Sequence, residues 1–469
     1  MMRNSIFAAL LSLGLAACAR TPAVPTAVPV DVADTSEISE VARDVYVWGY
    51  PLVQAARIRL FSTNPDAPGS AAGLFAPINR FAHGRVLANP ETKIGVGPNN
   101  DTLYSLARLD MEDGPFVLET PDFGDRYYTF SLNLADSSSI GAVGQRTHGG
   151  QLPPLFIHGS DYRGTVPQGF LSIASPTRYF SLAGRTVVRG EEEYPAVHSL
   201  QDRMRLVRYA DYLASSDALP PRSPQSPLDE PSIEAPEGLE FLEQLGQVLR
   251  DWRVRDEDRP FIEAARRLGI GPRGFDPLAL TGDRLQAARE GLRAGEELVL
   301  RRSLELGEQV NGWTTNYDGP RFGQDFELRA AVAKDQIFVA VPEEAVYPIG
   351  RVDSEGRLLD GRNSYRITMA AGETPPVDAF WSITLYDDRG FMVPNPIDRY
   401  SIGDRTKDLI RGSDGSVTIE LSHTGPTDPQ ANWLPAPPGR FYLMMRLYRP
   451  RPEVLSRDWQ PPKIERISG

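Results

Sequence analysis

A run of polar residues stands where a tyrosine-containing strand is expected to begin. Asn99, Asn100 and Asp101 come first, and Tyr104 follows. Asp101 could act as a general base or bind a hard divalent cation, while the two amides supply oxygen ligands or orient a substrate. The same residues are also typical of turns, because Asn and Asp side chains bond the backbone two residues further on. Both interpretations stay open.

A second candidate is the segment that carries His148. Arg146 precedes this histidine, and two glycines follow it. A histidine with a pKa of about 6.5 could move protons at neutral pH, and an arginine could stabilise developing negative charge. We therefore predict a catalytic set of Asp101, Tyr104, Arg146 and His148, with Asp101 or His148 as the base. An ordinary histidine on a surface loop is the alternative.

Arginines and aromatic side chains supply the predicted ligand contacts. A guanidinium on a strand is costly to bury unless it pairs with a carboxylate or an anionic ligand, and pairing with Asp101, Asp125 or Asp136 is the simpler account. The polar-tipped aromatic side chains Trp381, Tyr386, Trp433 and Tyr448 could stack on sugars or flat organic ligands, although such residues more often belong to sandwich cores. The predicted substrate-binding residues are Asn99, Asn100, Arg126, Arg185, Trp381, Asn395, Arg399 and Trp433.

The sequence also excludes several kinds of site. It contains no Gly-x-Ser-x-Gly elbow, no His-Glu-x-x-His and no phosphate-binding Gly-x-x-x-x-Gly-Lys-Ser/Thr. Its five histidines are not spaced as helical metal ligands, and it has one cysteine. The net charge is −12 without a basic tract, so nucleic acid is not an expected partner.

The residues before that cysteine have the layout of a secretory signal: a basic start at Arg3, an apolar stretch, and small residues. Leu15–Cys18 resembles a bacterial lipobox, which implies cleavage before Cys18 and attachment of lipid to its thiol. The apolar stretch is much shorter than the roughly 20 residues of a transmembrane helix. Ala19 stands after the cysteine where an aspartate would indicate inner-membrane retention. We therefore expect an outer-membrane lipoprotein that faces the periplasm.

The elements that would position these residues change in character along the chain. Helical spacing predicts a helix over Ser36–Leu60, with a kink or break at Pro51. Short apolar runs between turn residues predict an antiparallel sandwich from about residue 75 to 209. Residues 197–308 look helical, and strands return from Trp313. The expected strands are Thr102–Leu109, Pro115–Glu119, Arg126–Asn133, Leu155–His158, Gly169–Ala174, Tyr179–Val188, Gln336–Val341, Tyr365–Met369, Ala379–Tyr386, Val417–Leu421 and Phe441–Leu447, and Asn432–Pro437 is expected to be a rigid loop.

Several segments together resemble a known pairing of two domains of unknown function, numbered 1254 and 1214. Tyr46–Leu52 and Pro98–Tyr104 carry the resemblance to the first domain, and Phe380–Asp387 with Asn432–Pro437 carries it to the second. The resemblance implies two β-rich domains joined by helices. It implies no particular reaction.

We accordingly predict a mainly β protein with two antiparallel β-sandwich or jelly-roll-like domains and a helical segment between them. The expected function is that of a lipid-anchored cell-envelope protein acting as a hydrolase or lyase on a small organic or carbohydrate-like substrate. The alternative is a non-catalytic module that binds a ligand or an envelope partner. The predicted bounds are a signal peptide at 1–17, a Pro-rich tether at 18–35, an N-terminal helix and β-domain at 36–205, a helical connection at 206–312 and a C-terminal β-domain at 313–469.

Overall fold

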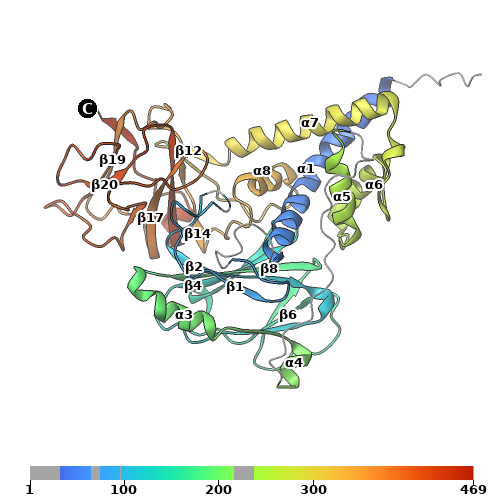
Figure 1. Ribbon diagram of the computed structural model, residues 1–469, viewed down its shortest axis with the longest axis horizontal. Helices are drawn as coiled ribbons and strands as arrows, with labels where there is room; N and C mark the ends of the chain where they lie inside the picture. The colour runs from blue at the N-terminus through green and yellow to red at the C-terminus, as the bar shows by residue number, and fades with distance from the viewer. Residues whose placement is uncertain (1–31, 65–73, 94, 96, 216–236, 468–469) are drawn as a thin grey trace, which may run out of the picture.

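The computed structural model of the chain describes residues 32–64, 74–93, 95, 97–215 and 237–467. They form two β-rich parts and one helical part, which lie side by side (Figure 1). Cys18 and the segments before and after it lie outside the described residues, so the lipid attachment stays a prediction. Within the described part, no helix combines the length and apolar character needed to cross a membrane.

The N-terminal β-rich part contains two sheets that share one apolar core. The five-stranded sheet has the order β1-β2-β8-β4-β5, and the four-stranded sheet has the order β7-β6-β3-β9. Only the pair β6 and β7 is parallel in these sheets. The strands are β1 (Phe81–His83), β2 (Thr102–Asp110), β3 (Phe116–Glu119), β4 (Tyr128–Leu134), β5 (Ser139–Gly144), β6 (Leu155–Gly159), β7 (Leu171–Ser175), β8 (Tyr179–Val187) and β9 (Arg205–Arg208), with short helices α2 (Gln145–His148), α3 (Tyr194–Asp202) and α4 (Tyr209–Leu213).

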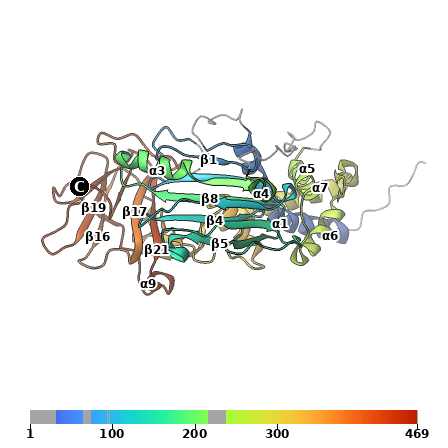
Figure 2. The ribbon, with the colours of Figure 1, turned by 90° about the horizontal axis from the view of Figure 1, so that it is seen from below.

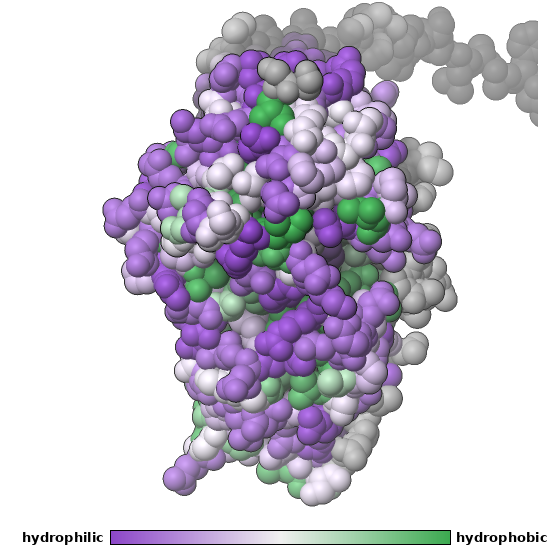
Figure 3. Space-filling model, turned by 90° about the vertical axis from the view of Figure 1, so that its left-hand side faces the viewer, coloured by the Kyte–Doolittle hydropathy of each residue, from purple (hydrophilic) through white to green (hydrophobic). Residues whose placement is uncertain are grey.

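The C-terminal β-rich part also packs two sheets around one core. The larger sheet has the order β12-β13-β15-β21-β17-β18, with β14 also paired to β21, and the smaller has the order β20-β19-β16-β22. Its outer face is largely hydrophilic with scattered apolar residues, as expected for a surface in contact with water (Figure 3). The strands are β12 (Glu308–Val310), β13 (Trp313–Thr315), β14 (Ala345–Val346), β15 (Ile349–Gly350), β16 (Ser364–Met369), β17 (Val377–Asp387), β18 (Ser401–Gly403), β19 (Val417–Ser422), β20 (Asn432–Pro435), β21 (Phe441–Pro450) and β22 (Glu465–Ile467), with helix α9 (Pro452–Leu455).

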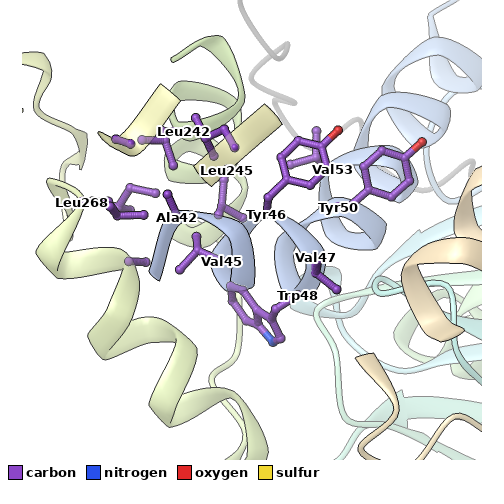
Figure 4. Packing of buried hydrophobic residues seen from close by; sticks show 14 of the residues in the cluster. Ala42, Val45, Tyr46, Val47, Trp48, Tyr50, Val53, Leu242, Leu245 and Leu268 are labelled. Carbon is purple, nitrogen blue, oxygen red and sulfur yellow. The ribbon is translucent and has the colours of Figure 1, made fainter. Parts of the chain in front are cut away.

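The helical part is built around α1, which contacts α5, α6, α7 and α8. Buried residues of α1, among them Val45 and Trp48, pack against Leu242 and Leu245 of α5 and against Leu268 (Figure 4). The first helix of the chain thus belongs to the same core as the helices of the middle region. The helices are α1 (Val32–Thr63), α5 (Glu240–Arg250), α6 (Arg259–Arg267), α7 (Gly282–Leu304) and α8 (Phe326–Asp335), and a small hairpin of β10 (Ile270–Gly271) and β11 (Gly274–Phe275) lies among them.

A buried ion network ties the helical part to the N-terminal sheets. Asp136, in the turn after β4, accepts from Arg255 at 2.8 Å and from Arg329 of α8 at 3.0 Å. Arg329 also donates to the backbone carbonyl of Trp48 in α1. Burial raises the pKa of Asp136, but the two arginines and the hydrogen bonds of Ser138 outweigh burial, so the net shift is downward. The carboxylate is therefore ionised at neutral pH and joins three segments of the chain.

The predicted fold class is confirmed, and the structure corrects three local expectations. Helix α1 does not break at Pro51 but runs through it, and Arg329 of α8 donates to the carbonyl of Trp48, three residues before the proline. Gln336–Val341 is not a strand; it follows α8, a helix whose nearly uniform burial hides any periodic pattern. The expected loop at 432–437 begins with strand β20, which pairs in parallel with β19.

We predict that Asp136→Asn destabilises the whole protein, because it leaves two arginines without their shared carboxylate. Removing one partner of a buried ion pair costs about 3–5 kcal/mol in the free energy of unfolding. The ionised Asp136 contributes to the free energy of unfolding at every pH above its pKa in the unfolded chain, about 3.9. This contribution is lost as the pH falls through the lower pKa that Asp136 has in the folded protein. The variant should therefore lose less stability on acidification than the wild type.

Urea unfolding between neutral and acidic pH measures both effects. Asp256→Asn is the matched control, since Asp256 pairs with Arg259 on the surface, where an ion pair contributes about 0–1 kcal/mol. Equal unfolding midpoints for the two variants would contradict the structural role of Asp136.

Candidate functional site

Two neighbouring strands of the C-terminal part carry polar side chains at every second position. In β17, Trp381, Ile383 and Leu385 enter the core, so the intervening side chains point to the opposite face. In β21, Leu443, Met445 and Leu447 do the same. The opposite face therefore presents Ser382, Thr384 and Tyr386 from β17 and Arg446 and Tyr448 from β21.

This polar face meets the ends of the N-terminal strands. Strands β8, β4 and β5 run up to the sheet that holds β17 and β21, and the two sets of strands cross in different directions (Figure 2). The segment before β2 makes the contact: Tyr386 donates to the carbonyl of Pro98 at 2.7 Å, and Arg446 donates to the carbonyl of Gly97 at 2.9 Å. Asn99 donates to the hydroxyl of Tyr448 at 2.6 Å.

Asp101 joins the two β-rich parts directly. One carboxylate oxygen accepts from Arg405 at 2.5 Å, and the other accepts from the hydroxyl of Ser382 at 2.6 Å. The side chain of Asp101 is 3% exposed, and Arg405 lies over the ring of Phe380 at 3.9 Å. Both oxygens thus accept from protein partners, and the divalent cation considered at Asp101 stays a prediction. Among the described residues, no group of three or more His, Cys, Asp or Glu could hold a metal ion.

Arg185 and Tyr104 form the innermost part of the site. They stand opposite each other on β8 and β2, and cross-strand partners share one face of a sheet. Arg185 donates to the Tyr104 hydroxyl at 3.2 Å and to the Ser131 hydroxyl at 3.1 Å. Within the described chain, neither Arg185 nor Arg446 forms an ion pair with a carboxylate, although both guanidiniums are buried.

The tyrosines around these two arginines differ in acidity. Burial alone raises the pKa of Tyr104, but the charge and hydrogen bond of Arg185 and the charge of Arg446 outweigh burial, so the pKa of Tyr104 is lowered. Burial raises the pKa of Tyr448 well above its ordinary value, and the negative charge of Asp101 adds to the effect. Burial likewise raises the pKa of Tyr347 and of Tyr386.

An open cleft of about 720 Å³ lies on the surface beside this cluster. Asn100, Asp101 and Ser382 line the cleft, so its wall is the same ion-paired contact that joins the two β-rich parts. Residues from the 397–407 segment, including Arg399 and Arg405, also line this cleft. The arrangement is therefore a solvent-open cleft with a buried arginine and tyrosine cluster next to it.

The structure brings together part of the predicted site. Asn99, Asn100, Asp101, Tyr104 and Arg185 all meet at the contact between the β-rich parts, and Asn100 donates to the hydroxyl of Ser401. Arg399 lines the neighbouring cleft and donates to the carbonyl of Trp433. These predicted residues therefore lie close together in the fold, as a single site requires.

The other half of the predicted catalytic set lies elsewhere. His148 is exposed in α2, where its ring contacts the hydroxyl of Thr147, and it makes no hydrogen bond to Asp101 or Tyr104. Arg146 pairs with the buried Glu344 at 2.9 Å. Glu344 also accepts from Tyr127, so Arg146 is held in a structural contact between the two β-rich parts.

Four predicted ligand contacts have structural partners instead. Arg126 pairs with Glu193 and donates to the carbonyl of Val187. Trp381 is 2% exposed in the C-terminal core and cannot stack on a ligand there. Asn395 bonds the backbone of its own loop, as the turn interpretation of such residues expects, and half-buried Trp433 donates to the carbonyl of Ser422.

Sequence reasoning missed the polar face of the C-terminal sheet. Tyr386 and Tyr448 were considered only as aromatic rings that could stack on a ligand, and Ser382, Thr384 and Arg446 were not among the predicted binding residues. The sequence does contain a signal for this face, because these polar residues alternate with large apolar residues along each strand. What no sequence pattern shows is that this face lies against another sheet rather than in water.

These features define a protein of two β-rich domains with a shared buried polar cluster at their contact. Comparison with family models matches residues 78–208 to a protein of unknown function, DUF1254, and residues 344–452 to a protein of unknown function, DUF1214. The chain belongs to the proteins that combine these two domains, and the expected resemblance is confirmed. Asp101, Tyr104 and Arg185 come from the first domain, and Ser382, Arg446 and Tyr448 come from the second.

One of the matching solved structures supports the same fold. The VPA0106 protein from Vibrio parahaemolyticus is similar with a TM-score of 0.67 and 24% identity, over 92% of this chain and 100% of that one. An uncharacterised protein from Burkholderia cenocepacia matches with a TM-score of 0.44 and 12% identity, over 93% of this chain and 95% of that one. No curated protein gives a significant match.

We predict that Asp101→Asn weakens the contact between the two β-rich domains, because Arg405 then loses its nearer carboxylate and keeps only Asp404 at 3.9 Å. Arg405 is 18% exposed, so the expected loss is about 2–3 kcal/mol, below the range for fully buried pairs. Hydrogen exchange should rise in the 397–407 segment, and the urea midpoint should fall. Asp388→Asn, on an exposed turn of the same domain, is the control, and equal exchange in both variants would refute the prediction.

Proposed function

We propose that the protein is a lipid-anchored cell-envelope protein that binds a small anionic organic molecule at the contact between its DUF1254 and DUF1214 domains. One observation carries the binding proposal: Arg185 and Arg446 are buried at this contact without a carboxylate partner in the described chain. A buried guanidinium is costly unless an anion compensates it.

The local count of charges supports an anionic ligand. Arg185, Arg446 and Arg405 bring three positive charges to the contact, and Asp101 and Asp404 bring two negative charges, both of which are paired with Arg405. Asp101 is close enough to favour the charged form of Arg446, but no ion pair joins them. Glu344 is occupied by Arg146 and Tyr127. The cluster therefore favours an added negative charge.

Two polar atoms of the cluster remain free to contact a ligand. Among the described residues, Nη2 of Arg185 and the hydroxyl of Tyr347 make no hydrogen bond, and neither belongs to the fully buried polar atoms that lack a partner. Tyr347 lies near enough to Arg185 and Tyr104 for their charges to shift its pKa. A carboxylate or phosphate placed here would accept from the guanidinium and from the phenol.

The envelope part of the proposal depends on the sequence that ends at Cys18. A basic start, an apolar stretch and small residues before the only cysteine support a lipidated N-terminus. Two or more acyl chains hold a protein stably on a membrane, whereas a single chain holds it marginally. An outer-membrane address with the folded domains in the periplasm is the corresponding proposal for location.

We predict that small anions raise the melting temperature through Arg185. Malonate and inorganic phosphate should stabilise the wild type, because a ligand at 100 times its dissociation constant adds about 2.7 kcal/mol. Arg185→Met should weaken binding by about 10- to 150-fold, the equivalent of one hydrogen bond to a charged group. Arg185→Lys keeps the charge and controls for folding.

His148→Ala is the matched control, because His148 is exposed on α2 and makes no hydrogen bond to the arginine and tyrosine cluster. Isothermal titration gives the affinities directly. A wild type that none of these anions stabilises, or an equal effect in Arg185→Met, would reject the site.

We also predict that Cys18→Ser moves the protein from the membrane fraction to the soluble fraction of bacterial cells, because the thiol that carries lipid is lost. Mass spectrometry of the native protein should find an N-terminal residue 18 with added acyl mass. Ser12→Ala, in the same leader, should stay in the membrane fraction. A native protein with an unmodified Cys18 still joined to Ala17 would exclude the anchor.

A further inference from the structure

We propose that a pocket between α1, α5 and the first β-rich domain binds a small aromatic carboxylate. This α1 pocket is formed around Leu52, Ala55, Ala56, Arg59, Tyr179 and Trp252, and its volume is about 170 Å³. An apolar cavity of about 150 Å³ holds one benzene molecule, so the pocket has the size of a single ring. The inference goes beyond the proposed function, because none of the described residues that line the pocket belongs to the DUF1214 domain.

One face of α1 supplies the apolar wall of the pocket. Residues three, four and eight positions apart share one side of a helix, and the apolar residues at this spacing that line the pocket are Leu52, Ala55, Ala56 and Leu60. The first three of them are buried. Because alanine side chains are short, the two alanines leave a space between α1 and the sheet. An apolar ring fits this space without displacing any polar group.

Guanidiniums form the polar end of the pocket. The last turns of α1 reach the sheet that contains β8 (Figure 1), and there Arg59 lies over the ring of Tyr179 at 3.5 Å. Arg178 lies over the same ring at 5.0 Å, so one phenol holds two guanidiniums in place. Arg250 of α5 also lines the pocket and is exposed, so the cationic end meets water while the alanine end is buried. An aromatic acid would enter with its ring first and keep its carboxylate among the guanidiniums.

A fourth guanidinium and a strained aromatic residue stand beside the pocket. Arg108 of β2 is 8% exposed and lies opposite Ser181, which lines the pocket. The guanidinium of Arg108 lies over the ring of Phe338 at 5.0 Å, and Phe338 also lines the pocket. The φ angle of Phe338 is 58°, a conformation that is rare for a bulky residue and persists only where the surroundings fix it. This part of the wall is therefore preformed.

Positive charge exceeds negative charge around the pocket. Three carboxylates pair with Arg178, at distances from 2.8 to 3.1 Å: Asp251, Asp110 and Glu112. The four guanidiniums around the pocket outnumber these three carboxylates. Burial lowers the pKa of Arg59, and Asp251 and Asp110 offset only part of the effect; burial and the charge of Arg59 lower the pKa of Arg108 to about 10. A bound carboxylate would add the negative charge that these guanidiniums favour.

Benzoate is the probe of the first test, and two related molecules show which of its parts the pocket recognises. Benzyl alcohol keeps the ring without the charge, and acetate keeps the charge without the ring. Isothermal titration of the whole protein should give benzoate an affinity at least about tenfold higher than either, because the pocket offers both a cationic end and an apolar wall. Benzoate that binds no better than acetate or than benzyl alcohol would overturn the assignment.

Two substitutions locate the binding. Arg59→Met should weaken benzoate by about 10- to 150-fold, the equivalent of one hydrogen bond to a charged group. Arg57→Met is the matched control, since Arg57 is exposed on the same helix and does not line the pocket. Ala56→Leu should remove benzoate binding, because the larger side chain occupies the space of the ring. Affinities in Arg59→Met and Ala56→Leu that equal the wild-type value would contradict the inference.

A measurement on the wild type keeps the inference testable even if a variant does not fold. In protein with labelled methyl groups, nuclear Overhauser effects should connect the ring protons of benzoate to the methyl groups of Ala55 and Ala56. Their absence at saturating benzoate would reject the pocket.

The outcomes separate this site from the proposed one at the domain contact. Arg185→Met should lose malonate and phosphate but keep benzoate, because Arg185 does not line the α1 pocket. If Arg185→Met loses all benzoate binding, benzoate binds at the domain contact and the present inference is wrong. If benzoate binds through Arg59 while neither malonate nor phosphate binds, the proposed function fails and this inference stands.

Discussion

The burial of two guanidiniums between two β-rich domains is the constraint on which the rest of the site depends. Arg185 reaches the contact from the first domain and Arg446 from the second, and both are held by hydroxyls and carbonyls rather than by carboxylates. Arginine stays protonated in proteins, so the positive charge persists at any physiological pH. The surroundings must respond by ionising a phenol or by admitting an anion.

The same contact explains why the two domains act as one unit. Asp101 of the first domain binds Arg405 and Ser382 of the second, and the main chain at Gly97 and Pro98 accepts from Arg446 and Tyr386. Neither domain alone holds both arginines. The proposed site requires a fixed domain orientation, which these hydrogen bonds supply.

A second buried network, separate from the contact between the two β-rich domains, holds the helical part against the N-terminal sheets. Asp136 pairs with Arg255 and Arg329, and Arg329 also donates to the carbonyl of Trp48 in α1. Asp258 accepts from the indoles of both Trp48 and Trp252, which connects α1 to the segment before α6. The two networks place buried charges at joints between elements, where each charge satisfies several donors at once and so determines one arrangement.

The sequence by itself determined the classes of element and half of the site. Apolar runs and turn residues located β2 and β8 to within one residue and β17 and β21 to within three, because each strand buries apolar side chains in a core. It also pointed to Asn99, Asp101, Tyr104 and Arg185. Only the tertiary structure decided that their partners are Ser382, Arg446 and Tyr448, that His148 lies apart, and that α8 is a helix. Local patterns record which residues avoid water, whereas contacts across roughly 280 or more residues, such as Asp101 with Ser382, arise only when two finished sheets meet.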